Sequence, residues 1–110
     1  MYPLAVSFLL FFCINVHALI PPDHSLLQNQ ISMNFIGTVY PTKALIARMK
    51  SRGEGIVVVT GSVASLFGIY GFSIYSSTKF ALRGFAEALH MEVVFHFIFS
   101  HALSVSLFCL

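Results

Sequence analysis

A short β-branched segment bounded by glycines, Gly55-Ile-Val-Val-Val-Thr-Gly61, constrains the fold more than any other part of this sequence. A continuous apolar run of this length is typical of a parallel strand covered on both faces, whereas a strand with one wet face would alternate apolar and polar residues. Such a strand needs parallel neighbours and helices packed against it. We therefore predict the central strand of an α/β sheet.

Helical periodicity flanks this strand on both sides. Between Ser32 and Lys50 apolar residues recur at about the spacing of one helix face, and the segment ends in basic residues and Gly53, which suit a helix end. Pro41 lies inside it and is expected to kink it, because proline lacks a backbone donor. A second helix is predicted from Ser73 to Val93. This helix–strand–helix slice predicts a partial Rossmann-like, doubly wound parallel sheet with apolar terminal segments.

Composition divides the chain into three zones. Of the 110 residues 57% are hydrophobic and only 9% are charged, and every charged residue lies between Asp23 and Glu92. Residues 31–93 have the composition of a globular piece, whereas residues 1–30 form an apolar leader and residues 94–110 an apolar tail. A net charge of +2, with one basic cluster at a predicted helix end, does not support nucleic-acid binding. The two cysteines and five scattered histidines have no metal-ligand spacing, so no metal site is expected.

The leader has three interpretations that the sequence leaves open. Residues 4–20 are apolar up to Pro21-Pro22, a length near that of a signal-peptide core and slightly short for an anchor that spans a bilayer. The same run is also typical of a buried parallel strand. The tail carries no charge beyond Glu92 and could contact a membrane.

Tyr75 and Lys79 carry the clearest chemical signal. Residues four apart lie on one helix face, so the Lys79 ammonium would sit beside the Tyr75 phenol. A neighbouring cation favours a phenolate, which would let Tyr75 act as a general acid or base. Ser62 follows the carboxyl end of the strand, where open α/β sheets place their sites, and could hold a carbonyl oxygen. Because no side chain donates a hydride, carbonyl reduction would require a nicotinamide cofactor.

Each candidate also has an ordinary structural interpretation. Ser62 alone would more often be a turn serine, and Ser65 competes with it a few residues away. Asn34, on the first turn of its helix, could be a capping or solvated residue. Tyr75 and Lys79 could be a partly exposed helix pair. The order and spacing of the whole set, and no single residue, favour the chemical interpretation.

This set resembles the catalytic tetrad of the short-chain dehydrogenase/reductase family, with further support from Asn34-Phe-Ile-Gly37 and from Gly84, over about residues 31–93. The resemblance implies that Tyr75 donates the proton and that Lys79 promotes its ionisation and binds the nicotinamide ribose. It also implies that Ser62 positions the substrate oxygen and that Asn34 supports a proton-relay water. Tyr75 and Lys79 are thus the expected cofactor-binding residues.

Within the family, Met33–Pro41 and Phe67–Val93 are similar to the members that reduce long-chain 3-keto amino alcohols in sphingolipid synthesis. This similarity implies NADPH as reductant, a long-chain keto amino alcohol as substrate, and association with the endoplasmic reticulum membrane. In the family, helices equivalent to residues 32–50 and 73–93 often build a homo-oligomer interface.

One family device is missing from the sequence. All seven glycines lie between Gly37 and Gly84, and none forms the Gly-x-x-x-Gly-x-Gly turn that cradles the cofactor phosphates. Residues 4–14 could supply at most one neighbour for the central strand. We therefore expect the chemical half of the site without the cofactor-binding half, as in a truncated or alternatively spliced product. Three functions stay open: a reductase, a non-catalytic fragment that pairs with a full-length subunit, and a short membrane-inserted or secreted polypeptide.

Overall fold

The computed structural model describes residues 6–9, 24–96 and 102–108. Three strands, β1 (Val6–Leu9), β2 (Glu54–Thr60) and β3 (Ala102–Phe108), form a sheet in the order β1-β2-β3. Both pairings are parallel, with Val6 opposite Ile56 and Ala102 opposite Glu54. The predicted α/β class and the central position of the glycine-bounded strand are therefore confirmed.

The second neighbour of β2 comes from a segment that was not expected to supply one. Residues 4–14 were expected to supply at most one partner for this strand, and β1 is that partner. The apolar tail supplies the other, because β3 pairs with β2 along its whole length, from Glu54 to Thr60. Residues 6–9 of the leader thus form a strand, and most of the rest of the leader lies outside the described residues.

The chain between β1 and β2 holds one long helical rod made of three contiguous elements. These are α1 (His24–Ile31), the π-helical η1 (Ser32–Ile36) and α2 (Gly37–Arg52). The rod begins earlier than the predicted Ser32 and ends at Gly53, whose φ of 76° permits the left-handed turn that closes the helix. Pro41 lies inside α2 without ending it, and the irregular winding falls at η1, just before it.

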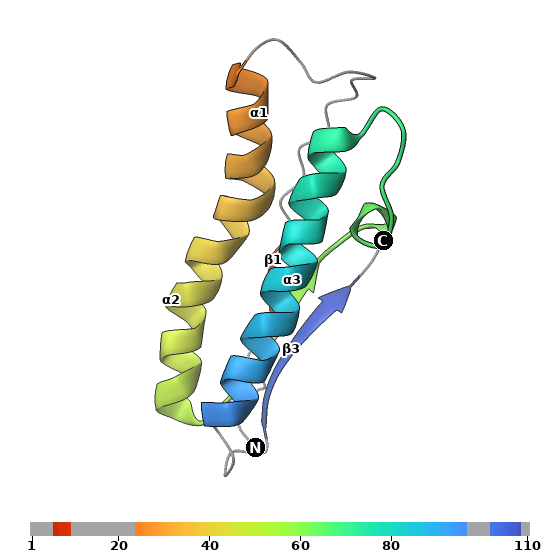
Figure 1. Cartoon of the computed structure of the whole chain (residues 1–110). Coiled ribbons are helices and arrows are strands. Elements are labelled where there is room, and N and C mark those ends of the chain that lie inside the picture. The colour runs from red at the N-terminus through yellow and green to blue at the C-terminus, as the bar shows by residue number, and fades with distance from the viewer. Residues whose placement is uncertain (1–5, 10–23, 97–101, 109–110) are drawn as a thin grey trace.

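The second predicted helix is α3 (Ser73–His96), which connects β2 to β3. A connection between two parallel neighbouring strands is right-handed. Because β1, β2 and β3 lie in the sheet in the same order as in the sequence, both crossover helices lie on the same face of the sheet. Figure 1 shows the α1–α2 rod and α3 side by side in front of the strands. α2 packs on β2, and α3 packs on β3.

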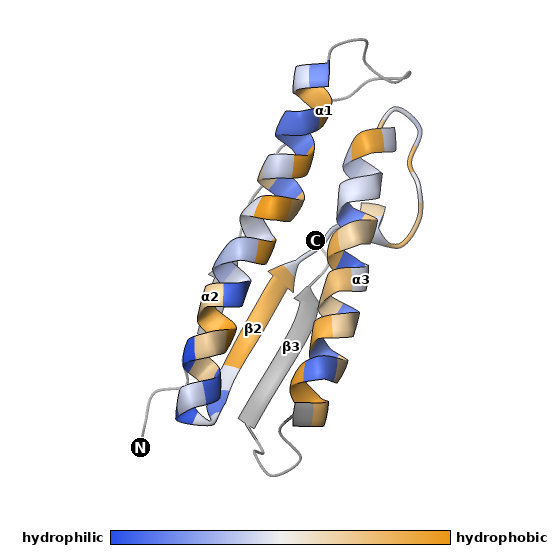
Figure 2. Ribbon diagram, turned by 60° about the vertical axis from the view of Figure 1, so that its left-hand side comes forward, coloured by the Kyte–Doolittle hydropathy of each residue, from blue (hydrophilic) through white to orange (hydrophobic). Residues whose placement is uncertain are grey.

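This arrangement buries the two faces of β2 unequally. Val57 and Val59 are fully buried under the helices, whereas Ile56 and Val58 on the opposite face are only half-buried. The expectation that helices cover this strand on both faces therefore fails for the described residues. Figure 2 shows that β2 is hydrophobic over most of its length, whereas α2 and α3 carry both hydrophobic and hydrophilic residues. Among the residues whose side chains the structure describes, the core consists of seven buried side chains: Ile46, Met49, Val57, Val59, Leu82, Ala86 and Val93.

The end of α2 lies very close to the start of β2, at Gly55. A Cβ added at Gly55 would come within 2.5 Å of the Met49 Cγ, which is fully buried. Only glycine therefore fits at this position while Met49 keeps its place. Within the described part of the chain, no helix is long and apolar enough to cross a membrane.

Candidate active site

The candidate residues gather where β2 ends and α3 begins. Thr60 is the last residue of β2, and Ser62 follows in the loop that contains the short 3₁₀ turn η2 (Val63–Ser65). α3 then returns along the sheet, and its first two turns carry Tyr75 and Lys79 past the end of β2. The Lys79 Nζ donates a hydrogen bond of 3.3 Å to the Thr60 carbonyl oxygen. This bond ties the lysine to the carboxyl rim of the sheet.

Lys79 is completely buried and lies over the ring of Tyr75, with its Nζ 5.7 Å from the ring centroid. Burial lowers the pKa of the Lys79 ammonium, because removing a charge from water disfavours the charged form. Tyr75 is also buried, with 4% of its surface exposed. The alternative of a partly exposed helix pair is therefore wrong. A buried lysine of this kind has no obvious structural use, because an apolar side chain would pack there without losing hydration.

Asn34 reaches the same place from the other helical rod. It lies in η1, is fully buried, and its Nδ2 donates a hydrogen bond of 3.2 Å to the Thr78 Oγ1. The Thr78 hydroxyl in turn donates to the carbonyl oxygen of Tyr75 over 2.7 Å. The alternative of a solvated asparagine is therefore excluded. Asn34 is thus joined to α3 at Thr78, the residue directly before Lys79.

Ser62 is half-buried and serves as the N-cap of η2. Its Oγ accepts from the backbone N–H of Ala64 at 3.3 Å, and its own N–H donates to the Ser65 Oγ at 3.0 Å. The turn-serine interpretation is thus correct, yet it does not exclude chemistry. Because Oγ only accepts in this bond, its hydrogen can still be donated to another oxygen. Ser65, the competing serine, is fully buried within the turn.

Two contributors to this site were not predicted from the sequence. The Thr60 carbonyl is a backbone group, so no residue type marks it. Thr78 lies inside the Tyr75–Lys79 motif, and its polar side chain on the buried face of a helix was an available signal.

The loop beside the site presents apolar side chains to its surroundings. Phe67 and Tyr70 are 56% and 87% exposed, and η2 packs against α3. Phe72, at the end of the loop, meets the Tyr75 ring edge-on with the centroids 6.0 Å apart. The sequence has no charged residue from Gly55 to Thr78. The loop and the start of α3 up to Thr78 are therefore uncharged.

The residues present fit one end of a nicotinamide cofactor. Tyr75 and Lys79 lie at the carboxyl rim of a parallel sheet, the place where open α/β sheets bind nucleotides, and they carry hydroxyl and ammonium groups that suit ribose oxygens. The sequence offers no glycine-rich turn for the phosphates. The fit therefore extends to the ribose and nicotinamide end.

Comparison with known proteins agrees with this geometry. The profile of the family described as short chain dehydrogenase matches residues 17–104. The match runs past Val93, so the expectation that the resemblance stops there is wrong. The matched stretch reaches into β3.

A 3-ketodihydrosphingosine reductase from Bos taurus is 52% identical over 69 residues, which cover 63% of this chain and 21% of the relative. The chain thus spans about a fifth of the length of the curated relatives it matches. Among solved structures, a short-chain dehydrogenase from Streptomyces avermitilis superposes with a TM-score of 0.67 at 29% identity, covering 79% of this chain and 30% of that one. ElxO with NADP bound superposes with a TM-score of 0.77 at 20% identity, covering 88% and 37%.

Proposed function

Because the chain belongs to the short-chain dehydrogenase family, we propose that it carries the proton-delivery part of an NADPH-dependent reductase acting on 3-ketodihydrosphingosine. The observation that carries the proposal is the buried Lys79 beside Tyr75 at the rim of the sheet, tied to the Thr60 carbonyl. The substrate is suggested by the 52% identity to a 3-ketodihydrosphingosine reductase.

The proposed reaction reduces a ketone to a secondary alcohol. When bound, a nicotinamide cofactor would supply the hydride for the carbonyl carbon. Tyr75 gives its phenolic proton to the carbonyl oxygen, so the alcohol is neutral when it leaves. Lys79, close to the phenol ring, stabilises the negative charge that proton loss leaves on Tyr75. Ser62 donates its hydroxyl hydrogen to the carbonyl oxygen and so holds it in place. Asn34 supports the water through which Tyr75 regains a proton.

The loop that leads into α3 supports a long-chain substrate. Its exposed Leu66, Phe67 and Tyr70 would give an alkyl chain an apolar surface. No charged side chain in the loop would have to lose its hydration when the chain binds. A short, charged keto acid would gain nothing from this surface.

The test is NADPH binding and consumption by the purified chain. We expect saturable NADPH binding, and oxidation of NADPH when 3-ketodihydrosphingosine is added. Tyr75→Phe serves as the matched control, since it keeps the ring and removes the proton. Failure to bind NADPH up to about 1 mM, which corresponds to about −4 kcal/mol of binding free energy, would contradict the proposal.

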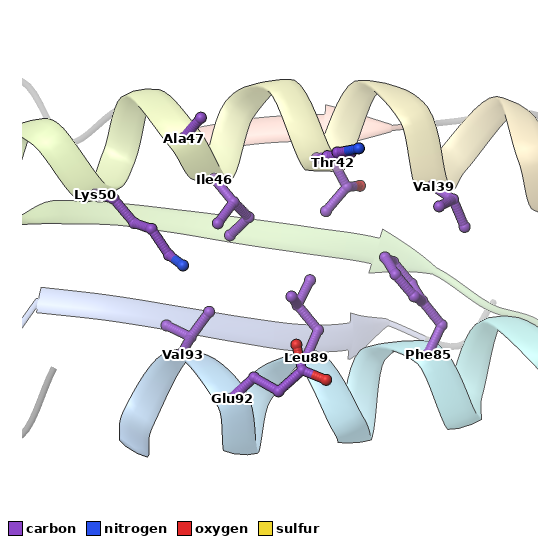
Figure 3. A pocket seen from close by; sticks show the side chains of 10 residues that line it. Val39, Thr42, Ile46, Ala47, Lys50, Phe85, Leu89, Glu92 and Val93 are labelled. Atoms are coloured by element: carbon purple, nitrogen blue, oxygen red, sulfur yellow. The ribbon is translucent and has the colours of Figure 1, made fainter. Parts of the chain in front are cut away.

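We also propose, on the same family basis, that the chain pairs through the outer faces of the α1–α2 rod and of α3. The partner would be a copy of the chain or a full-length subunit. A groove of about 390 Å³ runs between α2 and α3 and is mainly apolar. Figure 3 shows Ile46 and Leu89 pointing into it from the two helices, with Lys50 and Glu92 towards one end. A complex that survives dilution to micromolar concentration supports pairing, and an exclusively monomeric chain contradicts it.

Association with the endoplasmic reticulum membrane is part of the same proposal, since the proposed substrate is a lipid. Carbonate extraction of cells that express the chain tests its membrane insertion. Recovery in the membrane pellet supports insertion, including the third function of a short membrane-inserted polypeptide. Release into the supernatant contradicts insertion, and fractionation without carbonate then tests peripheral association.

A further inference from the structure

The hydroxyl of Thr78 connects Asn34, in the α1–α2 rod, with Tyr75, in α3. It accepts the hydrogen bond from the Asn34 Nδ2 at 3.2 Å and donates its own hydrogen to the Tyr75 carbonyl oxygen at 2.7 Å. Thr78 is 4% exposed and Asn34 is fully buried, so water does not compete for either bond. The two bonds join η1 to the first turns of α3.

The direction of these bonds determines how the Asn34 side chain is turned. A hydroxyl has one hydrogen to donate, and that of Thr78 is used on a carbonyl oxygen, which can only accept. Towards Asn34 the hydroxyl can therefore act only as an acceptor. Of the two ends of the carboxamide, only the amino group can face it, and the carboxamide oxygen has to point elsewhere.

We propose that Thr78 is a positioning residue that holds the Asn34 carboxamide in one of its two orientations. The anchor of this arrangement is the backbone of Tyr75 itself, and Thr78 precedes Lys79 directly. The orientation of Asn34 is thus set from the same helical turn that carries the tyrosine and the lysine. The effect of Thr78 on catalysis rests on the proposed reductase function, whereas its effect on Asn34 does not.

A second buried threonine shows what a purely structural role looks like. Thr42 is 1% exposed and donates to the Thr38 carbonyl oxygen at 2.7 Å. This back-bond is a common way for a helical threonine to satisfy its hydroxyl. In the part of the chain that the structure describes, the Thr42 side chain makes no second hydrogen bond of the kind that Thr78 makes to Asn34. Thr42 is therefore the matched control.

The test compares Thr78→Val, Thr78→Ala and Thr78→Ser with Thr42→Val by NMR of side-chain amide groups. The Asn34 signals are assigned from the spectrum of Asn34→Ala. We expect both apolar variants at position 78 to shift the two Asn34 amide proton signals or to merge them by exchange. Serine, which keeps the hydroxyl, should restore the original shifts, and Thr42→Val should leave them in place. The backbone signals of each variant report whether it folds. If Thr78→Val does not fold, Thr78→Ala takes its place in the comparison.

Unchanged Asn34 signals in a folded Thr78→Val or Thr78→Ala variant would overturn the proposal, and so would an equal change in Thr42→Val. Where the chain reduces 3-ketodihydrosphingosine, we expect Thr78→Val to lower kcat by about tenfold to a hundredfold with little change in KM, since misplaced groups slow the chemical step. If the unmodified chain has no reductase activity, the proposed function is rejected. The NMR comparison still decides the role of Thr78.

Discussion

The two halves of α3 face the same sheet with opposite chemistry. The amino-terminal part, Ser73–Lys79, is called the polar half below and buries Tyr75, Thr78 and Lys79. The remainder, Phe80–His96, is called the apolar half and buries Leu82, Ala86 and Val93. Because burial of polar groups costs free energy unless they are well paired, a helix selected for stability alone would continue the apolar pattern to its first turn. The polar half is therefore best explained by the chemistry proposed for it, and the apolar half by the packing that holds the helix in place.

The largest difference between the halves should appear in catalysis. Tyr75→Phe removes the proposed proton donor, and we expect activity to fall by about a hundredfold to ten-thousandfold. The ring stays, so the edge-on contact with Phe72 and the melting temperature should change little. Steady-state kinetics and thermal melts of the same samples measure both. Full activity in this variant would contradict the assigned role.

The opposite result is expected in the apolar half. Leu82→Ala should lower the free energy of unfolding by about 2–5 kcal/mol, because Leu82 is 1% exposed and lies in the core. Its side chain is not placed in the chemistry, so the remaining folded fraction should keep its turnover number. Urea unfolding measures the change. A loss below about 1 kcal/mol would show that this half does not hold the helix on the sheet.

Lys79→Met should sharpen the contrast, since it extends the apolar pattern into the polar half. Folding lowers the pKa of Lys79. At pH values between this lowered pKa and the ordinary lysine pKa, the folded chain therefore binds fewer protons than the unfolded chain. The stability of the unmodified chain should therefore rise with pH through that window. We expect the variant to be more stable at neutral pH, by a margin that shrinks as the pH approaches about 10.4, the ordinary lysine pKa.

Unfolding free energies of both chains between neutral pH and the upper end of this window test the prediction. A variant that is less stable at neutral pH would show that the lysine bond to Thr60 outweighs its burial.

The smallest effect is expected on the outer face of the same helix. Arg83 Nε and Glu87 Oε1 form an ion pair at 2.8 Å, with the two side chains 41% and 60% exposed. Arg83→Gln should change the free energy of unfolding by less than about 0.5 kcal/mol, because solvent screens such pairs. Melting curves at low and high salt check this. A large or salt-independent loss would mean that this face is covered by a partner.

The sequence predicted the parts of the molecule that depend on local pattern. The position of β2, the start of α3 at Ser73, the α/β class and the family follow from the glycine-bounded run, the helical spacing and the Asn34–Ser62–Tyr75–Lys79 order. α3 runs three residues past its predicted end at Val93. The roles of these four residues stay predictions. β3 could not be predicted, because an uncharged apolar tail has the same composition whether it pairs with a strand or contacts a membrane.

Other features depend on the direction of individual bonds or on layers that form only in three dimensions. The cap made by Ser62, the lysine bond to the Thr60 carbonyl and the Thr78 link to Asn34 need the positions of hydrogens and of the backbone. The one-sided burial of β2 follows from both crossovers having the same hand, which the residues of β2 alone do not reveal.

The most direct test of the account is the titration of Lys79 itself, because its burial beside Tyr75 is what separates a chemical site from a chance spacing. The ¹³Cε resonance of Lys79, assigned from Lys79→Met, is followed as the pH is raised. The account predicts a midpoint below the ordinary lysine pKa of about 10.4, in the direction that burial dictates. A midpoint at or above that value would place the ammonium in water and contradict the site described for this chain.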